Sequence, residues 1–207
     1  MSDTRPSASD AAGQPDLAAL LGSRICHDLA GPLGAVANGL ELLEMAHGES
    51  EELALVRGAV DAGLARLRLF RLAFGAGGGD GPVPAREVSA LLTSVYGDTR
   101  IEAAWRDAGD RPRAEMRLAL LALLCVETAM PRGGRIEVRR DAEAWAIRAE
   151  AERLRIDHLL WEALGRAALP ADLRGAEVQF GLLAAESRAL RRPVSVEADE
   201  RRLALVV

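Results

Sequence analysis

Apolar residues recur at steps of three and four along the first long segment of the chain, from about residue 17 to residue 46. This spacing is typical of an α-helix that buries one stripe of its surface. Pro32 lies in the middle of the pattern and removes one backbone hydrogen bond, which predicts a kink in the helix. The stripe predicted to be buried consists of Leu17, Leu21, Ile25, Leu29, Leu33, Val36, Leu40 and Leu43.

A second amphipathic helix is predicted to follow after a short loop. His47 and Gly48 indicate the end of the first helix, Ser50 can cap the second, and Glu51 and Glu52 suit its first turn. Two helices joined by so short a loop form an antiparallel hairpin. The apolar stripe of the second helix contains Leu53, Val56, Val60, Leu64, Leu67, Phe70 (or Arg71) and Phe74.

Two helices cannot enclose a hydrophobic core by themselves. We therefore predict that the hairpins of two copies combine into a four-helix bundle, which makes the protein a homodimer. The alternative is that the hairpin packs only against the C-terminal domain of its own chain.

The chain is predicted to contain two domains. Residues 1–15 are rich in small and polar residues and are expected to be a disordered tail. The helical hairpin occupies residues 16–75, a glycine-rich linker residues 76–82, and a domain of mixed helices and strands residues 83–207. The fold class is therefore α+β.

The pattern beyond the linker predicts helices layered on a mixed sheet. The expected helices cover residues 84–96, 113–130, 156–169 and 176–190, and the expected strands centre on residues 101–105, 136–138, 145–147, 194–196 and 203–207.

Composition narrows the possible functions. All 26 basic residues are arginine, so a P-loop lysine and a Schiff-base lysine are excluded. The net charge of −5 argues against a nucleic-acid partner. No apolar run is long enough to span a membrane and no signal peptide is expected, so we predict a cytoplasmic protein. Cys26 and Cys125 match no metal or redox spacing and are expected to be reduced thiols.

His27 lies on the outer face of the first helix. At about 100° per residue it is roughly 160–200° from Ile25 and Leu29, so its imidazole is predicted to point to solvent. Gly31 and Gly34 lie on the same face and cost about 1 kcal/mol each relative to alanine in a helix. They indicate a surface cleared for a large partner, although a plain surface histidine or a close helix–helix contact would also explain the pattern.

The residues after His27 carry a family resemblance. An acid follows at the next position, then leucine, with Pro32 and Leu33 five and six positions on. This spacing resembles the H-box of two-component histidine kinases, in which the histidine takes a phosphoryl group. The longer string from Ser23 to Leu29, with residues 37–44 and 69–76, resembles the ChpT-type histidine phosphotransferases of bacterial phosphorelays, and the likeness covers residues 17–207.

The order of elements beyond the linker resembles the ATP-binding domain of histidine kinases, but its nucleotide motifs are missing. Where that family places asparagines, the chain has Cys125, Val126, Glu127 and Thr128, and residues 149–154 lack the expected aspartate and glycines. A glycine-rich lid is also absent. The resemblance therefore implies a degenerate ATPase-like α/β sandwich that binds no ATP and helps to dock a partner.

The resemblance also implies roles at the histidine. His27 would carry the phosphoryl group, and Asp28 would orient its ring, although adjacent helical residues point about 100° apart. Ser23, one turn back, is a second possible orienter. Arg24 could pair with phosphoryl oxygens or with an acidic partner. Both Asp28 and Arg24 could instead be ordinary surface residues.

The predicted partners are the receiver domain of a hybrid histidine kinase and downstream response regulators. No cofactor of the chain's own is expected, because Mg²⁺ would be supplied by the receiver domain.

The rival functions are an ATP-dependent histidine kinase and a non-catalytic scaffold or kinase-inhibitor dimer. Gly31, four positions after the histidine, cannot position a water, so phosphatase activity is not expected. Docking is predicted around His27 through Ser23, Arg24, Leu29, Gly31, Pro32, Leu33, Gly34, Asn38 and Glu41.

Overall fold

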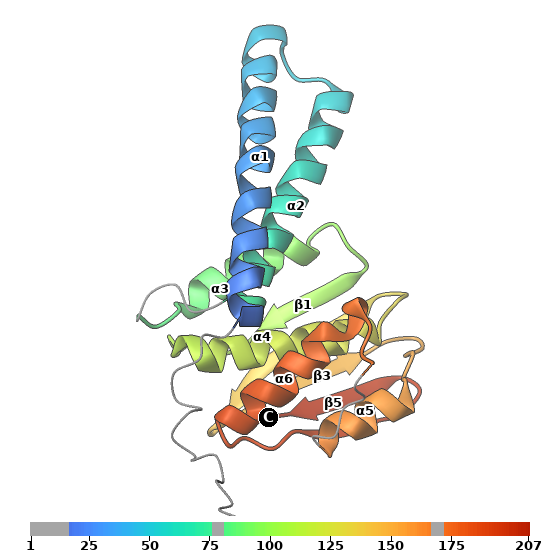
Figure 1. Ribbon diagram of the computed structural model, residues 1–207. Helices are drawn as coiled ribbons and strands as arrows, with labels where there is room; N and C mark the ends of the chain where they lie inside the picture. Colours follow the sequence, from blue (N-terminus) through green and yellow to red (C-terminus); the bar gives the residue numbers. More distant parts are fainter. Residues whose placement is uncertain (1–16, 76–80, 167–171) are drawn as a thin grey trace, which may run out of the picture.

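A helical hairpin projects from a helix-covered sheet in the computed structural model, which describes residues 17–75, 81–166 and 172–207 (Figure 1). The hairpin consists of α1 (Leu17–His47) and α2 (Glu51–Phe74). Gly48 ends α1 with a φ of +82°, and its N–H donates to the carbonyl of Glu44 at 2.8 Å. The hydroxyl of Ser50 accepts from the Leu53 N–H at 3.2 Å and caps α2. The predicted hairpin and both of its predicted caps are confirmed.

The helix α1 continues through Pro32 as one α-helix (Figure 1). Proline removes one donor from the backbone ladder but does not end the helix, because the turns on either side retain their own hydrogen bonds.

The stripe of α1 that was predicted to be buried is mostly exposed within the single chain, so the packing of α1 against α2 does not bury it. The seam with α2 instead contains small or medium residues, with Ala19, Cys26 and Leu40 buried. Small side chains let two helices approach closely, so α1 turns this face toward α2 and its larger side chains away from it. Of the predicted stripe, Leu40 is buried and Leu33 is half-buried, the side chain of Leu17 is outside the described part, and the exposed members are Leu21, Ile25, Leu29, Val36 and Leu43.

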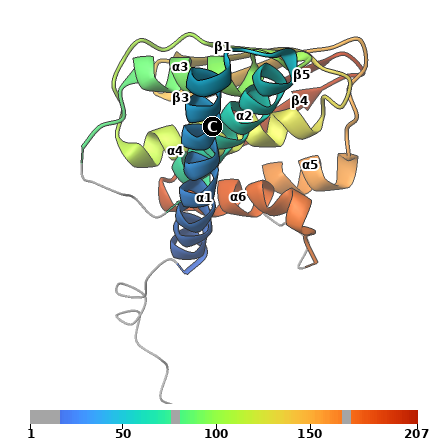
Figure 2. The ribbon, with the colours of Figure 1, turned by 90° about the horizontal axis from the view of Figure 1, so that it is seen from above.

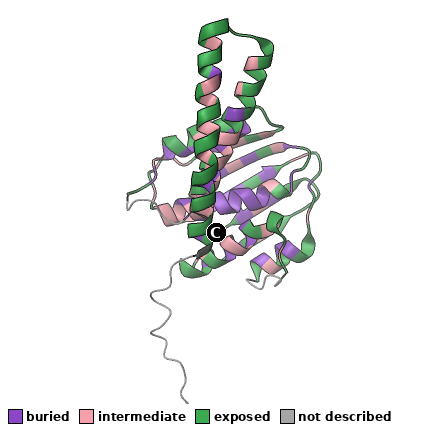
Figure 3. Cartoon of the chain, turned by 45° about the horizontal axis from the view of Figure 1, so that its top comes forward, coloured by how far each residue is buried: buried purple, intermediate pink, exposed green. Residues whose placement is uncertain are grey.

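The helix α2 contributes buried residues both to the hairpin and to the hydrophobic core of the C-terminal elements. Val60 is buried on the hairpin, whereas Ala65, Leu69 and Ala73 belong to the same hydrophobic core as the C-terminal elements. Figure 3 shows that burial is concentrated in the C-terminal elements and the base of the hairpin, while the tip is exposed. The base of the hairpin therefore packs against the C-terminal elements of its own chain, and the upper part of the hairpin has no such cover.

The C-terminal elements form a mixed sheet covered by helices on one face (Figures 1 and 2). The strand order is β1-β2-β3-β5-β4; β1 and β2 are parallel and the other neighbours antiparallel. The elements are α3 (Ala85–Tyr96), β1 (Ile101–Trp105), α4 (Arg113–Thr128), β2 (Gly134–Asp141), β3 (Ala144–Glu150), α5 (His158–Gly165), η1 (Gly175–Glu177), α6 (Val178–Ala189), β4 (Ser195–Ala198) and β5 (Arg202–Val206).

These elements confirm the predicted α+β class and the predicted mixed sheet. The helix predicted at residues 156–169 is shorter, and residues 167–171 lie outside the described part. The helix predicted at residues 176–190 begins with a 3₁₀ turn. Every residue from Leu118 to Val126 is buried, because α4 is enclosed by the sheet, α2 and α6. This enclosure explains why its sequence is apolar on nearly every side.

Candidate functional site

His27 presents its ring to solvent from the lower part of α1, with 86% of its side chain exposed. The prediction of an outward imidazole is confirmed. Its Nδ1 lies 3.2 Å from Oδ1 of Asp28, within hydrogen-bonding distance. The side chain of Asp28 therefore reaches back to the ring even though adjacent helical residues point in different directions.

Asp28 also accepts from Arg24 one turn earlier. The Nε of Arg24 donates to Oδ2 at 2.7 Å, so each carboxylate oxygen has its own partner. The hydrogen bond to His27, followed by that from Arg24, lowers the pKa of Asp28 below its usual range. Arg24, His27 and Asp28, which we call the histidine cluster, thus form a connected group on one exposed helix face.

Ser23 is directed at the base of the hairpin. A Cβ added to Gly75 would lie 2.8 Å from Oγ of Ser23 and 2.4 Å from the carbonyl oxygen of Arg71, so this position requires glycine. Gly22 likewise faces Phe74 closely. Of the two candidate orienters of His27, Asp28 is the one within hydrogen-bonding distance of the ring.

The two glycines near His27 face open space. A Cβ added to Gly31 or to Gly34 would meet no atom within 4 Å. A close contact between helices of this chain therefore does not explain them. The surface beside the ring is clear at both positions, as the approach of a large partner would require.

The other predicted docking residues are distributed over two faces of α1. Pro32, Asn38 and Glu41 are exposed, as is Leu29 on the uncovered apolar stripe. Leu33 is half-buried against α2, where its Cδ1 would lie 3.9 Å from a Cβ at Gly63.

Cys26 contributes to packing beside the histidine. Its side chain is buried in the hairpin seam, and burial raises the pKa of the thiol, an effect that the charge of Arg71 partly opposes. A protonated, buried thiol is a poor nucleophile, so Cys26 is a small seam residue that allows α1 to approach α2.

Within the described residues, no group of three or more histidine, cysteine, aspartate or glutamate side chains is placed to hold a metal ion. No helix among those residues is both long and apolar enough to cross a membrane.

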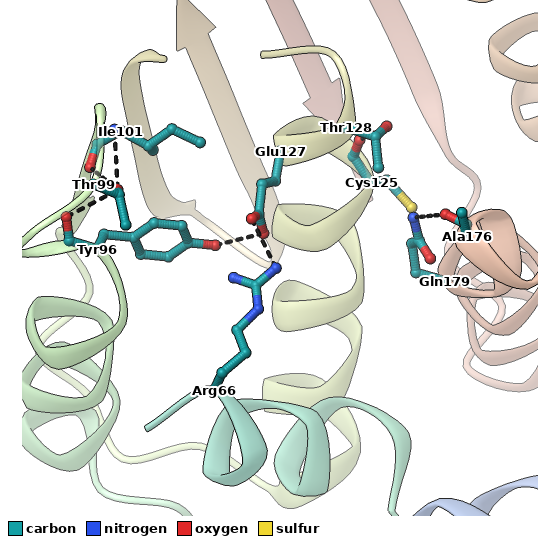
Figure 4. Close-up of polar contacts among 9 residues, drawn as sticks. All are labelled: Arg66, Tyr96, Thr99, Ile101, Cys125, Glu127, Thr128, Ala176 and Gln179. Carbon is teal, nitrogen blue, oxygen red and sulfur yellow. Dashed lines mark hydrogen bonds and ion pairs between the residues drawn. The ribbon is translucent and has the colours of Figure 1, made fainter. Parts of the chain in front are cut away.

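A second polar cluster lies where the sequence predicted missing nucleotide contacts (Figure 4). Glu127, near the end of α4, accepts from Arg66 of α2 at 2.7 Å and from the hydroxyl of Tyr96 of α3 at 2.8 Å. The guanidinium of Arg66 also lies 5.1 Å from the ring centre of Phe70. Burial, followed by the charge of Glu127, raises the pKa of Tyr96. We call Arg66, Tyr96 and Glu127 the tyrosine cluster.

Two polar side chains near this cluster form hydrogen bonds to backbone carbonyls of the protein. The hydroxyl of Thr128 donates to the carbonyl of Cys125 at 2.7 Å, and the side-chain amide of Gln179 donates to the carbonyl of Ala176 at 2.9 Å. A mostly apolar cleft of about 580 Å³ lies between α2, α4 and the start of α6. Sequence reasoning missed the tyrosine cluster because its three members are far apart in the chain and follow no common spacing.

Comparisons with known proteins agree with this geometry. A family described as "Histidine phosphotransferase C-terminal domain" matches residues 85–202. The chain is 32% identical over 193 residues to the protein phosphotransferase ChpT of Brucella abortus (strain 2308), covering 89% of this chain and 92% of that protein. A solved structure titled "1.7 Angstrom Structure of a Bacterial Phosphotransferase" shares 28% identity with a TM-score of 0.67 and covers 98% of both chains. The chain therefore belongs to the ChpT-type histidine phosphotransferase family.

Proposed function

We propose that His27 relays a phosphoryl group between aspartates of receiver domains, from a hybrid histidine kinase to response regulators. The single observation that carries this proposal is an exposed imidazole with one nitrogen within hydrogen-bonding distance of a carboxylate and with open space beside it. As the sequence predicts, such a relay would operate in the cytoplasm.

The geometry of the histidine cluster suits a reversible nucleophile. With Nδ1–H donating to Asp28, Nε2 keeps its lone pair and faces solvent. Nε2 attacks the phosphorus of a receiver's aspartyl phosphate, the bond from phosphorus to the aspartyl oxygen breaks, and the aspartate leaves as a carboxylate. The ring then carries a positive charge, which Asp28 stabilises. The reverse attack by a second receiver's carboxylate breaks the N–P bond and restores the neutral ring.

Arg24 holds Asp28 in place in this mechanism. Its bond to the second carboxylate oxygen fixes the orientation of the acid that orients His27. Mg²⁺ bound to the receiver would compensate the charge on the transferred phosphoryl group, in keeping with the general need for metal in phosphoryl transfer. The chain's own contribution is the position, tautomer and accessibility of the imidazole.

We further propose that the C-terminal domain receives no phosphate from ATP. The carboxylate of Glu127 is occupied by Arg66 and Tyr96, and Thr128 is bonded within its own helix. A nucleotide in this region would have to displace these contacts, and the sequence offers none of the asparagines or glycines that the kinases use. The phosphoryl group would therefore come from another protein.

We also propose that the protein is a homodimer. The uncovered stripe of α1 and the exposed Leu55 and Val56 of α2 are large apolar side chains on the two helices of one hairpin. A second hairpin that covers them would complete a four-helix bundle. Sedimentation of Ile25→Asp should then show monomers, with Met45→Asp at the hairpin tip as the matched control that leaves the wild-type mass unchanged.

The experiment that tests the relay offers the protein two labelled phosphoryl donors, a phosphorylated receiver domain and ATP with Mg²⁺. Acid-labile label should appear on wild-type protein from the receiver alone and should be absent from His27→Gln. Stable labelling of His27 by ATP alone would support a histidine kinase instead. Unchanged downstream activity of His27→Gln, with partner binding retained, would support a scaffold.

A further inference from the structure

A basic cleft lies at the base of the hairpin, one helical turn from His27. It has a volume of about 950 Å³ and lies between α1, α2 and α3, with the first residue of α4 at its wall. Figure 1 shows α3 beside the foot of the hairpin. Its charged lining residues are Arg68, Arg71, Arg113 and Glu87.

The guanidinium groups of the three arginines are not paired with an acid in the described part of the chain. Within residues 17–75, 81–166 and 172–207, no ion pair or side-chain hydrogen bond involves Arg68, Arg71 or Arg113. The Nε of Arg113 is buried and lacks an acceptor in that part of the chain. An unpaired buried N–H costs free energy that an incoming acceptor would recover. Against these cations the cleft contains one acid, in a chain whose net charge is −5.

The cleft reaches α1 one helical turn before His27. Ser23 lines it and lies four residues before His27, which corresponds to about 6 Å along the helix axis. A partner domain that forms a specific complex covers about 800 Å² of surface. A receiver domain centred on His27 would therefore also cover Ser23, which lines the cleft.

We propose that the basic cleft binds an acidic segment of the receiver domain whose aspartyl phosphate reacts with His27. This inference rests on the proposed function and adds a second contact to it. Guanidinium groups bind carboxylates through paired hydrogen bonds, so arginines select an acidic loop or helix end rather than an apolar one. The contact sets how long and in what orientation the receiver remains over the imidazole.

The test uses the full-length protein carrying Arg68→Gln together with Arg71→Gln. Both side chains are exposed, so these changes leave the core intact, and the partly buried Arg113 is not altered. We expect KM for the phosphorylated receiver to rise about tenfold with kcat nearly unchanged, because the lost contacts serve binding and not the chemical step. The KM difference between wild type and variant should shrink as salt is added.

The matched control is Arg86→Gln on α3, an exposed arginine that does not line the cleft. It should leave KM at the wild-type value. Phosphoramidate, a small donor that makes no use of a docking surface, should phosphorylate His27 equally in all three proteins.

Two results would overturn the inference while leaving the relay intact: a wild-type KM in the double variant, or an equal rise in Arg86→Gln. A tenfold change that persists unaltered at high salt would also contradict it, because the effect would not be electrostatic. Failure of the wild-type protein to accept phosphate from the receiver, despite labelling by phosphoramidate, would instead contradict the proposed function.

Discussion

The histidine cluster and the tyrosine cluster contain the same kinds of group in opposite surroundings. Each joins an arginine and an aromatic ring through one carboxylate. The histidine cluster lies on a single exposed helix, whereas the tyrosine cluster connects three helices and is partly buried. Exposure leaves the ring of His27 free to react, while burial makes the carboxylate of Glu127 a structural link. The degree of burial, more than the type of residue, therefore distinguishes the reactive histidine cluster from the structural tyrosine cluster.

The largest expected effect is that of His27→Gln, which removes the nucleophile. Phosphoryl transfer from a labelled receiver should fall by at least about a thousandfold, because no other described group can accept the phosphate at that place. The melting temperature should stay at the wild-type value, since the His27 side chain is almost fully exposed. Residual transfer at a substantial fraction of the wild-type rate would remove His27 from the mechanism.

Glu127→Gln should lower the stability of the protein. Arg66 would lose its counter-charge in a partly buried position, so the free energy of unfolding should fall by about 2 kcal/mol. Urea denaturation measures this loss. Glu102→Gln, which removes an exposed ion pair with Arg135, is the matched control and should have little effect. Equal losses in both variants would show that the tyrosine cluster is not a structural link.

Asp28→Asn tests the orienting role within the histidine cluster. We expect phosphorylation of His27 to slow about tenfold, because an amide does not stabilise the positive charge on the phosphorylated ring. The lowered pKa of Asp28 keeps the wild-type carboxylate ionised throughout the neutral and mildly acid range, so the ratio of the two rates should not change with pH across that range. Identical rates throughout would make Asp28 an ordinary surface acid.

The smallest expected effect is a titration shift at Tyr96, the single tyrosine of the chain. Its pKa is raised in the folded protein, so tyrosinate absorbance should appear only above the ordinary value of about 10. Because the unfolded chain ionises first, the stability that Tyr96 contributes is complete below that pH and declines as pH rises further. In Glu127→Gln the midpoint should move down, and an unmoved midpoint would contradict the contact.

Periodicity and caps predicted much of the fold, and the reason is physical. The spacing of apolar residues, Ser50 as a cap and Gly48 as a terminator act locally, so they can be recognised without knowledge of distant neighbours. The buried face of α1 could not be recognised in this way. A pattern of large side chains predicts an apolar surface but does not say which partner covers it, and within the chain the small residues around Cys26 meet α2.

In the candidate site, too, the features set by local spacing could be predicted and those set by tertiary structure could not. His27 and its outward position follow from helical spacing, and so does the proximity of Arg24. The contact between Asp28 and the ring depends on side-chain rotamers that spacing does not determine. The tyrosine cluster and the basic cleft join residues from separate elements, so they become visible only when the tertiary structure places α2, α3 and α4 together.

The most direct test of the central claim is a complete relay reconstituted from a labelled donor receiver, this protein and an unlabelled acceptor receiver. We expect label to reach the acceptor's aspartate only when the protein is present, passing through an acid-labile intermediate on His27. We also expect His27→Gln to stop the transfer. Label that reaches the acceptor equally well with His27→Gln, or that stays acid-stable on the wild-type protein, would contradict the account.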